Sequence, residues 1–215
     1  MIVDERIITF INSLDTKNSE ILEDIEREAL ADNVPIIRRE MQSFLKVLLM
    51  VKKPMRVLEV GTAVGFSALL MSEYVPEECA ITTIENYEKR IPIARQNFVR
   101  AGREKKITLL EGDAMDVLKT LEGPYDFAAK GQYIHYLPEI LRLLAKGGIL
   151  VSDNVMQDGD VIESRFAVER RDRTIHARMR EYLYELKHND ALVTSIIPLG
   201  DGVALSVKKE VGTDI

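Results

Sequence analysis

From Met55 onward the sequence alternates short apolar runs with segments of helical periodicity, and this alternation restricts the possible folds more than any other feature. The apolar runs cover residues 55–60, 80–85, 106–112 and 147–154, and helical patterns fill the intervals. Strands that alternate with helices form βαβ units with a buried parallel sheet. We therefore predict an α/β fold with a doubly wound, Rossmann-like sheet.

The C-terminal part departs from this pattern. A long polar helix is predicted over about 161–188, and two apolar runs then follow, VTSIIPL and GVALSVKK. Only Gly200-Asp201 separates these runs, and strands joined so tightly pair as antiparallel neighbours. We expect a mostly parallel sheet that ends in an antiparallel hairpin.

The N-terminal part is predicted to be helical. Apolar residues at three- and four-residue spacing indicate helices over 4–14, 19–30 and 38–51. The 215 residues suit one domain, so we expect a single domain over 1–215, with a helical N-terminal extension (1–52) and a core (53–215).

Composition excludes several classes of protein. No apolar run approaches the roughly 18 residues that a membrane span needs, and the N-terminus lacks a signal-peptide pattern. Cys79 is the only cysteine, which excludes an intramolecular disulfide and a multi-cysteine zinc site. The net charge of −6 argues against a protein that coats nucleic acid, although a local basic patch stays open. We expect a soluble, cytoplasmic protein with no membrane partner.

A pair of glycines follows the first predicted strand, in the segment EVGTAVG (59–65). Gly61 permits a tight turn beside a bound cofactor, and Gly65 permits close approach at the start of a helix. An ordinary tight turn is an equal alternative on this signal alone. The spacing G-x-x-x-G differs from the G-x-G-x-x-G of dinucleotide folds, which argues against a nicotinamide-dependent dehydrogenase.

Two acidic residues follow the next two strands. Glu85 ends the second strand, 24 residues beyond Gly61, where doubly wound folds place the carboxylate that binds ribose hydroxyls. Asp113 follows the third strand and either accepts from an adenine amino group or caps the next helix. Gly61, Glu85 and Asp113 thus stand at the carboxyl ends of three successive strands. This arrangement favours an adenosine-containing cofactor without a diphosphate.

These segments resemble the cation-dependent S-adenosylmethionine O-methyltransferases of the catechol methyltransferase type. The matching segments are EVGTAVGFSALLM, TTIE, EGDA, AAKGQY, VSDNV and PLGDGVALSVKK, in the same order along nearly the whole chain. The resemblance implies S-adenosylmethionine as cofactor. It implies cofactor contacts at Glu59, Gly61, Ser67, Glu85, Asp113 and Ala114.

The resemblance also implies a Mg²⁺ site. Asp153-Asn154 follows the run GGILVS, where an Asp-Asn pair by itself reads as an ordinary turn. In the resembling family these positions supply two oxygen ligands to Mg²⁺, an ion that prefers hard oxygen donors. The three histidines (His135, His176 and His188) lack ligand spacing, and we interpret them as surface residues.

One position departs from the family pattern. The fourth strand of relatives ends in a metal-binding acid that is followed by two residues and then a lysine; here the segment is PYDFAAKGQY, and about four residues including the acid are absent. Only Asp126–Ala129 lie between the flanking predicted helices, fewer than the roughly five residues that a strand needs. We therefore expect residues to be missing between Phe127 and Ala128. If they are truly absent, Mg²⁺ binding and activity are both in doubt.

The resemblance assigns catalysis to Lys130, as the group that accepts the hydroxyl proton or stabilises the resulting anion; a solvated loop lysine is the alternative. In the metal scheme, Mg²⁺ would bind the reacting hydroxyl and a second, adjacent oxygen of the substrate. A catechol meets this requirement, and so does 5-hydroxyuridine.

A basic segment favours an RNA substrate. Six arginines against two acids give residues 165–180 a local charge of +4. Clustered arginines track phosphates and stack on bases, although a solvated helix face with ion pairs gives the same pattern. The RNA-binding candidates are Arg38, Arg39, Arg170, Arg171, Arg173 and Arg178.

The run RRDRTIHARMREY further resembles the bacterial tRNA 5-hydroxyuridine methyltransferases, which modify the wobble uridine. This resemblance implies tRNA as substrate and a homodimer that the apolar N-terminal helices would support. Two alternatives stay open: an O-methyltransferase of small catechol-like phenols, and a non-catalytic RNA-binding protein with a methyltransferase fold.

Overall fold

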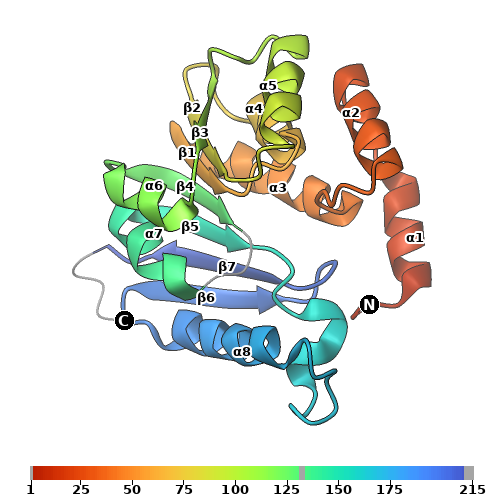
Figure 1. Cartoon of the computed structure of the whole chain (residues 1–215), viewed down its shortest axis with the longest axis vertical. Coiled ribbons are helices and arrows are strands. Elements are labelled where there is room, and N and C mark those ends of the chain that lie inside the picture. Colours follow the sequence, from red (N-terminus) through yellow and green to blue (C-terminus); the bar gives the residue numbers. More distant parts are fainter. Residues whose placement is uncertain (1, 131–133, 211–215) are drawn as a thin grey trace. The chain divides into compact units, whose positions relative to one another are not determined.

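The computed structural model describes residues 2–130 and 134–210, and strands alternate with helices through its central part (Figure 1). The chain divides into two compact units, Thr9–Thr120 and a second unit that combines Met1–Ile8 with Leu121–Ile215. No helix among the described residues is long and apolar enough to cross a membrane.

The unit Thr9–Thr120 holds three parallel strands in the order β3-β2-β1. Its elements are α1 (Glu5–Leu14, which begins in the other unit), α2 (Glu20–Ala31), α3 (Arg39–Lys52), β1 (Arg56–Val60), α4 (Phe66–Tyr74), β2 (Ala80–Glu85), α5 (Ile91–Arg100), β3 (Ile107–Glu111) and α6 (Ala114–Thr120). The three predicted N-terminal helices and the first three predicted strands are confirmed to within about one residue at each end.

β1 and β2 are apolar because both of their faces are covered. Val57, Leu58, Ile81 and Ile84 are all buried, although neighbouring strand residues point to opposite faces. A strand buried on both faces reads as a continuous apolar run, which is the pattern in the sequence. Phe66 at the start of α4 is buried as well.

The other unit holds four strands in the order β4-β5-β7-β6. Its elements are β4 (Tyr125–Lys130), η1 (Ile134–Tyr136), α7 (Leu137–Leu143), β5 (Leu144–Ser152), η2 (Gln157–Ile162), α8 (Arg173–His188), β6 (Leu192–Ile197) and β7 (Val203–Lys208). β4 and β5 are parallel, whereas β7 pairs antiparallel with β5 and β6. The predicted C-terminal hairpin is confirmed, and the described strands of the two units are mostly parallel, as predicted.

The strand β4 is continuous, so the expectation of missing residues is wrong. Phe127 and Ala128 pair with the consecutive residues Ile149 and Leu150 of β5. The strand is six residues long because it includes Tyr125 and Lys130 in addition to Asp126–Ala129. The segment Ala-Ala-Lys therefore completes the strand, and no gap interrupts it.

The long helix predicted over 161–188 is also wrong in its first half, because α8 begins only at Arg173. Between residues 163 and 172 only Val168 is buried. A helix in water is stabilised mainly by the packing of an apolar face, and this segment has too few apolar residues to provide one. Arg165, Arg170 and Arg171 consequently precede the helix.

Candidate active site

The glycine loop between β1 and α4 turns tightly at the end of β2. Gly61 has a φ of +103°, and the N–H groups of Gly61 and Thr62 both donate to the carbonyl of Ile84. Gly65 has a φ of +86° and precedes α4, and a Cβ there would lie 2.5 Å from a ring carbon of Phe98. The predicted turn at Gly61 and the close approach at Gly65 are confirmed, and cofactor contact at Gly61 stays a prediction.

Glu85 holds this loop through its carboxylate. One oxygen accepts a hydrogen bond of 2.7 Å from the N–H of Ala63, and the other accepts from the N–H groups of Asn86 and Tyr87, each at 3.0 Å. A carboxylate oxygen has two lone pairs, so only the oxygen that accepts from Ala63 retains capacity to accept from a ribose hydroxyl. The structure therefore shows Glu85 as a loop-anchoring residue, and ribose binding stays a prediction.

Glu59 lies in a buried network of hydroxyl groups. Ser67 donates to one carboxylate oxygen and Thr83 to the other, while the hydroxyls of Thr83 and Thr62 lie 2.6 Å apart. Burial raises the pKa of Glu59 to about 7, although these hydrogen bonds oppose the shift. Ser67, predicted as a cofactor contact, is thus a partner of Glu59, and Thr83 is a member of the network that sequence reasoning missed.

The raised pKa of Glu59 predicts that the protein loses stability as the pH rises. Between pH 4.5 and about 7, Glu59 binds a proton in the folded state and is ionised in the unfolded chain. This contribution is complete below pH 4.5 and is lost as the pH rises through 7, and it amounts to about 3 kcal/mol of the free energy of unfolding. Urea unfolding from pH 5 to 8 should show the decline in the wild type and not in Glu59→Gln. The exposed Glu78→Gln should retain the decline, and an identical decline in Glu59→Gln would contradict the prediction.

Asp113 caps α6. Its carboxylate accepts a hydrogen bond of 2.8 Å from the N–H of Met115, which satisfies one of the unpaired donors of the first turn. Ala114 is the first residue of the helix and is buried. The capping role left open by the sequence is confirmed, and contact with an adenine stays a prediction for both residues.

The residues predicted for catalysis and metal binding lie at the carboxyl ends of β4 and β5. Lys130 ends β4, and its backbone is in register with Ser152, the residue before Asp153. Asp153 accepts a hydrogen bond of 2.7 Å from the N–H of Asn154, whose φ is +56°. The register thus brings the backbone of Lys130 to the same sheet edge as the Asp153-Asn154 pair.

Among the described residues, this edge supplies only part of the Mg²⁺ site that the resemblance implies, and Mg²⁺ binding stays a prediction. Asp153 and Asn154 are two adjacent oxygen donors, and the third acid is missing from a strand that is now known to be continuous. Among the described residues, no group of three His, Cys, Asp or Glu side chains is placed to hold a metal ion. The donor set is incomplete for a hard divalent cation.

Two contacts that sequence reasoning missed fix the chain beside Asp153. The hydroxyl of Tyr182 on α8 lies 2.5 Å from that of Ser152, and burial raises the pKa of Tyr182 to about 12. Asp201 accepts from the N–H of Asp158, and its own carbonyl accepts from Met156. Because the turn before β7 is close to η2 only in the folded chain, no spacing in the sequence indicated these pairs.

One of the three histidines is not a surface residue. His176 on α8 is buried, its Nε2 lies 3.1 Å from the carbonyl of Glu163, and its Nδ1 has no hydrogen-bond partner in the described part of the chain. Most residues of α8 are polar, so the sequence pattern did not indicate that one face of this helix is buried. The expectation of a surface position is wrong for His176 and holds for the exposed His188.

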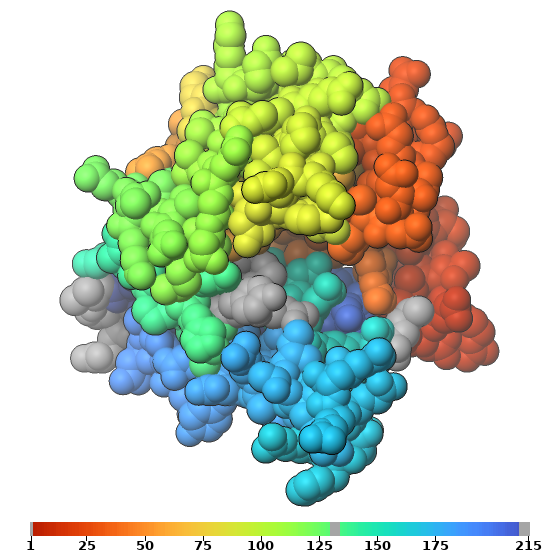
Figure 2. Space-filling model, in the orientation of Figure 1, coloured from red at the N-terminus to blue at the C-terminus, as the bar shows by residue number. Residues whose placement is uncertain are grey.

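The arginines of residues 165–180 lie at the surface (cyan to blue in Figure 2) and are mostly free of acidic partners. Arg171 pairs with Glu169 and Asp172 at 3.0 and 3.3 Å. Arg173 and Arg180 donate to main-chain carbonyls, which neutralise no charge. Within the described residues Arg165, Arg170 and Arg178 have no hydrogen-bond or ion-pair partner.

The other two RNA-binding candidates belong to the unit Thr9–Thr120. Arg39 pairs with Glu26 at 3.1 Å and with Glu23 at 3.5 Å, and so links α3 to α2. Its charge is therefore already compensated. Arg38 directly precedes α3, and RNA contact stays a prediction for both residues.

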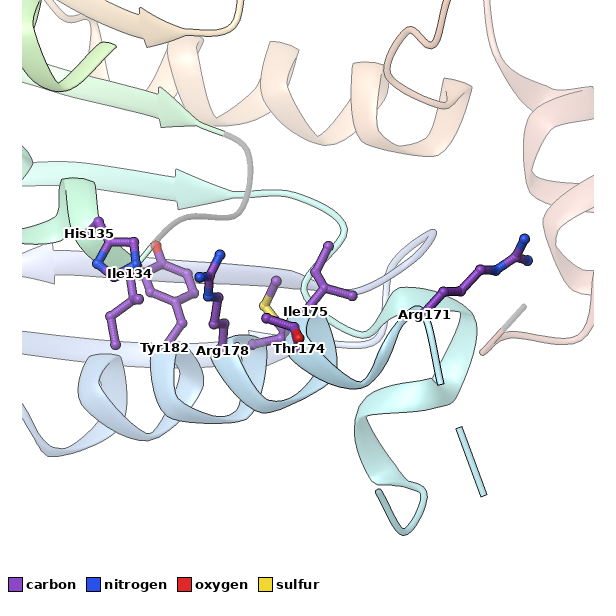
Figure 3. Close-up of a pocket in the computed structure, with 8 residues that line it drawn as sticks. Ile134, His135, Arg171, Thr174, Ile175, Arg178 and Tyr182 are labelled. Carbon is purple, nitrogen blue, oxygen red and sulfur yellow. The ribbon is translucent and has the colours of Figure 1, made fainter. Parts of the chain in front are cut away.

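A pocket of about 200 Å³ lies between η1 and α8, within one unit of the chain. Figure 3 shows Ile134 and His135 of η1 on one side and Arg178 and Tyr182 of α8 on the other. The remaining lining residues are Arg171, Thr174, Ile175 and Met179. The pocket therefore combines apolar side chains with the guanidinium of Arg178, which has no partner among the described residues.

The fold and the glycine loop define an α/β protein of the Rossmann-like class. A sequence model of the O-methyltransferase family matches residues 12–209, so the chain belongs to the O-methyltransferase family.

Individual relatives agree with this assignment. A catechol O-methyltransferase of Niastella koreensis is 33% identical over 128 residues, covering 56% of this chain and 58% of that protein. Caffeoyl-CoA O-methyltransferase 2 of Populus trichocarpa is 31% identical over 183 residues, covering 75% and 70%. The SAH-bound methyltransferase PaMTH1 of Podospora anserina has the same fold, with a TM-score of 0.87, 24% identity and 97% of each chain covered. The predicted fold class and methyltransferase family are confirmed.

Proposed function

We propose that this chain transfers a methyl group from S-adenosylmethionine to the 5-hydroxyl of 5-hydroxyuridine in tRNA. The observation that carries the RNA substrate is the uncompensated basic segment at residues 165–180 beside the pocket. Membership of the O-methyltransferase family supports the reaction type, and the SAH bound by PaMTH1 supports the cofactor.

The cofactor contacts that we propose all belong to one unit. Glu59 lies in β1, Glu85 ends β2 in register with the last residue of β3, and Asp113 follows β3 by two residues. Ligands of open α/β sheets bind beyond these carboxyl ends, and Gly61 leaves the approach to the turn free of side-chain atoms.

Methyl transfer is an in-line displacement in which the hydroxyl oxygen bonds to the methyl carbon as the carbon–sulfur bond breaks. S-Adenosylhomocysteine leaves with the electron pair, and the hydroxyl proton must go to a base. We assign this proton to Lys130, because its backbone lies at the end of β4 opposite Ser152. The enzyme's contribution is to align the oxygen with the methyl group and to accept the proton.

The pocket between η1 and α8 supports a nucleotide as the bound group. Ile134, Ile175 and Met179 provide apolar surface for a base, and Arg178 provides a cation for a phosphate. A catechol carries no phosphate and gains nothing from a free arginine. The pocket therefore favours RNA over a small phenol.

Two other readings have support of their own. Methylation of a catechol-like phenol is favoured by the names of the Niastella and Populus relatives. A non-catalytic RNA-binding protein is favoured by the incomplete donor set at Asp153-Asn154. Labelled S-adenosylmethionine offered with 5-hydroxyuridine tRNA, with the same tRNA carrying uridine, and with catechol separates all three. Transfer to catechol alone would end the tRNA proposal, and tRNA binding without transfer would support the non-catalytic reading.

The arginine segment supplies a sharper test of the substrate. Replacing Arg165, Arg170 and Arg178 together by glutamine should lower methyl transfer to tRNA by about tenfold, because each lost cation removes a phosphate contact. The loss of these contacts should also reduce the dependence of tRNA binding on salt. Transfer to catechol, if present, should change less than about twofold. Initial rates and tRNA affinities between 50 and about 200 mM salt measure both effects.

The matched control removes three other surface arginines. Arg27, Arg95 and Arg142 each pair with an acid, so their joint replacement by glutamine changes the net charge equally without removing an unpaired cation. Equal losses in the two triple variants would show that the segment acts only through net charge and would contradict the proposed RNA contact.

We also propose that the chain forms a homodimer through its N-terminal helices. No residue of α1 is buried, and Phe10 and Leu14 are 63% and 69% exposed. Val47 and Val51 of α3 are exposed as well. Exposed apolar side chains at this density mark an interaction surface, and a second copy of the chain is the partner that we propose.

A further inference from the structure

Phe166 is the most exposed large apolar residue in the described part of the chain, and it lies within the basic segment 165–180. It is 84% exposed, whereas Phe66, Phe98 and Phe127 are buried. A single exposed apolar residue is ordinary on a protein surface, so its surroundings decide its meaning. We infer that Phe166 is a stacking platform for an unpaired base of the RNA substrate. The inference rests on the proposed function for the RNA and on the surroundings of the ring for the stacking.

The loop around Phe166 holds the ring at the surface. The N–H of Ala167 donates to the carbonyl of Ser164 at 2.8 Å, and the N–H of Phe166 donates to the hydroxyl of Ser164 at 3.3 Å. Residues 164–167 therefore form a tight turn. Val168, the next apolar residue, is buried and anchors the loop. The turn thus exposes the aromatic ring while it buries the valine.

Arg173, the first residue of α8, orients this ring. Its guanidinium carbon lies over the ring, 5.9 Å from the centroid, and its Nε donates to the carbonyl of Val168 at 3.3 Å. The ring is therefore in place before a ligand binds. Arg173 directly precedes Thr174, which lines the pocket between η1 and α8. The first turn of α8 thus serves both the platform and the pocket.

The charges around the ring indicate a polyanion as the partner. Arg165 directly precedes the aromatic residue, and neither Arg165 nor Arg170 has a hydrogen-bond or ion-pair partner within the described residues. The nearby acids Glu169 and Asp172 both pair with Arg171. Sites for single-stranded RNA combine cations for the phosphates with aromatic rings for the bases. Because bases within a duplex are already stacked on both faces, an exposed ring selects an unpaired base.

The direct test uses fluorescence, because the sequence contains no tryptophan. Phe166→Trp places a single indole at the platform and keeps a flat ring for stacking, and stacking on a base quenches its emission. An RNA stem-loop with the sequence of the tRNA anticodon arm should quench this emission, and the same stem closed as a blunt duplex should not. Phe10→Trp, on the exposed side of α1, is the matched control and should keep its emission with either RNA.

Binding measurements separate stacking from the contribution of charge. Phe166→Ala and Phe166→Leu should each bind the stem-loop about tenfold more weakly, because neither offers a flat ring, whereas Phe166→Tyr should stay within about twofold of the wild type. The slope of log Kd against log salt should be unchanged in all three variants, since no cation is lost. The triple glutamine variant of Arg165, Arg170 and Arg178 should instead reduce that slope by about 0.7 for each phosphate contact removed.

Three results would overturn the inference. Full affinity in Phe166→Leu would indicate an apolar contact instead of stacking. Binding of the stem-loop without quenching of Phe166→Trp would end the platform alone, and no binding at all would end the RNA substrate with it. Vesicles of phosphatidylserine that shift the emission of Phe166→Trp to the blue, with no response to RNA, would assign the ring to a lipid surface. If neither tRNA nor catechol is methylated, the proposed reaction fails, and the quenching, measured without cofactor, still decides the platform.

Discussion

Replacing Glu85 with glutamine is expected to lower the affinity for S-adenosylmethionine by at least about tenfold and the free energy of unfolding by about 2 kcal/mol. The carboxylate accepts from three main-chain N–H groups, of Ala63, Asn86 and Tyr87. Glutamine keeps one oxygen and turns an NH₂ group toward donors that then lose their acceptor. An unsatisfied buried donor costs about 1–3 kcal/mol.

The change should affect the cofactor more than the fold, because Glu85 holds the glycine loop and is also the acid that we propose for the ribose hydroxyls. Calorimetric titration with S-adenosylmethionine and SAH measures the affinity, and urea unfolding measures the stability.

Glu111→Gln is the matched control for Glu85→Gln. Glu111 is in register with Glu85 at the end of the neighbouring strand, yet its side chain is 51% exposed and pairs with Arg95. An exposed ion pair contributes about 0–1 kcal/mol, so this variant should bind the cofactor as the wild type does. Unchanged cofactor affinity in Glu85→Gln would refute the ribose assignment while leaving the loop-anchoring role intact.

Gly65→Ala is expected to cost about 3 kcal/mol of the free energy of unfolding and to reduce cofactor binding with it. The positive φ of Gly65 alone strains an alanine by about 1–2 kcal/mol. The new methyl group would also lie 2.5 Å from a ring carbon of Phe98, which is itself buried. Overpacking of this kind costs about 1–3 kcal/mol.

Gly102→Ala separates the two contributions. Gly102 has a φ of +63°, but an added Cβ there meets nothing within 4 Å, so only the backbone strain of about 1–2 kcal/mol should appear. In a Phe98→Ala background the difference between the two glycine variants should shrink toward zero, as the clash is removed. A difference that persists there would show that Phe98 is not its cause. Urea unfolding of all four variants measures these free energies.

The helices and strands of the N-terminal half were predictable because their signals are local. Periodic apolar residues place α1, α2 and α3, and unbroken apolar runs place β1 and β2. Where the pattern was weak, prediction failed. β4 was judged too short because only Asp126–Ala129 lie between the predicted helices, yet pairing with β5 extends the strand to Lys130.

The features of the candidate site also divide into those that the sequence predicts and those that it does not. Gly61, Gly65, Glu85 and Asp113 follow strand ends directly, so the sequence indicates their place at one edge of a parallel sheet. Other contacts of the site join residues that are not neighbours in the chain. They are the hydrogen bonds of Glu59 with Ser67 and Thr83, and that of Ser152 with Tyr182. Sequence spacing carries no information on such pairs.

The sequence by itself determined the alternation of strands and helices, the glycine loop and the order of the family motifs, because turns and apolar periodicity are properties of neighbouring residues. Only the tertiary structure decided that β4 is unbroken and ends at Lys130 beside Asp153, since strand pairing is a long-range interaction that overrides local propensity. It likewise decided that His176 is buried and that Arg178 borders a pocket, because burial depends on what the rest of the chain places against a helix.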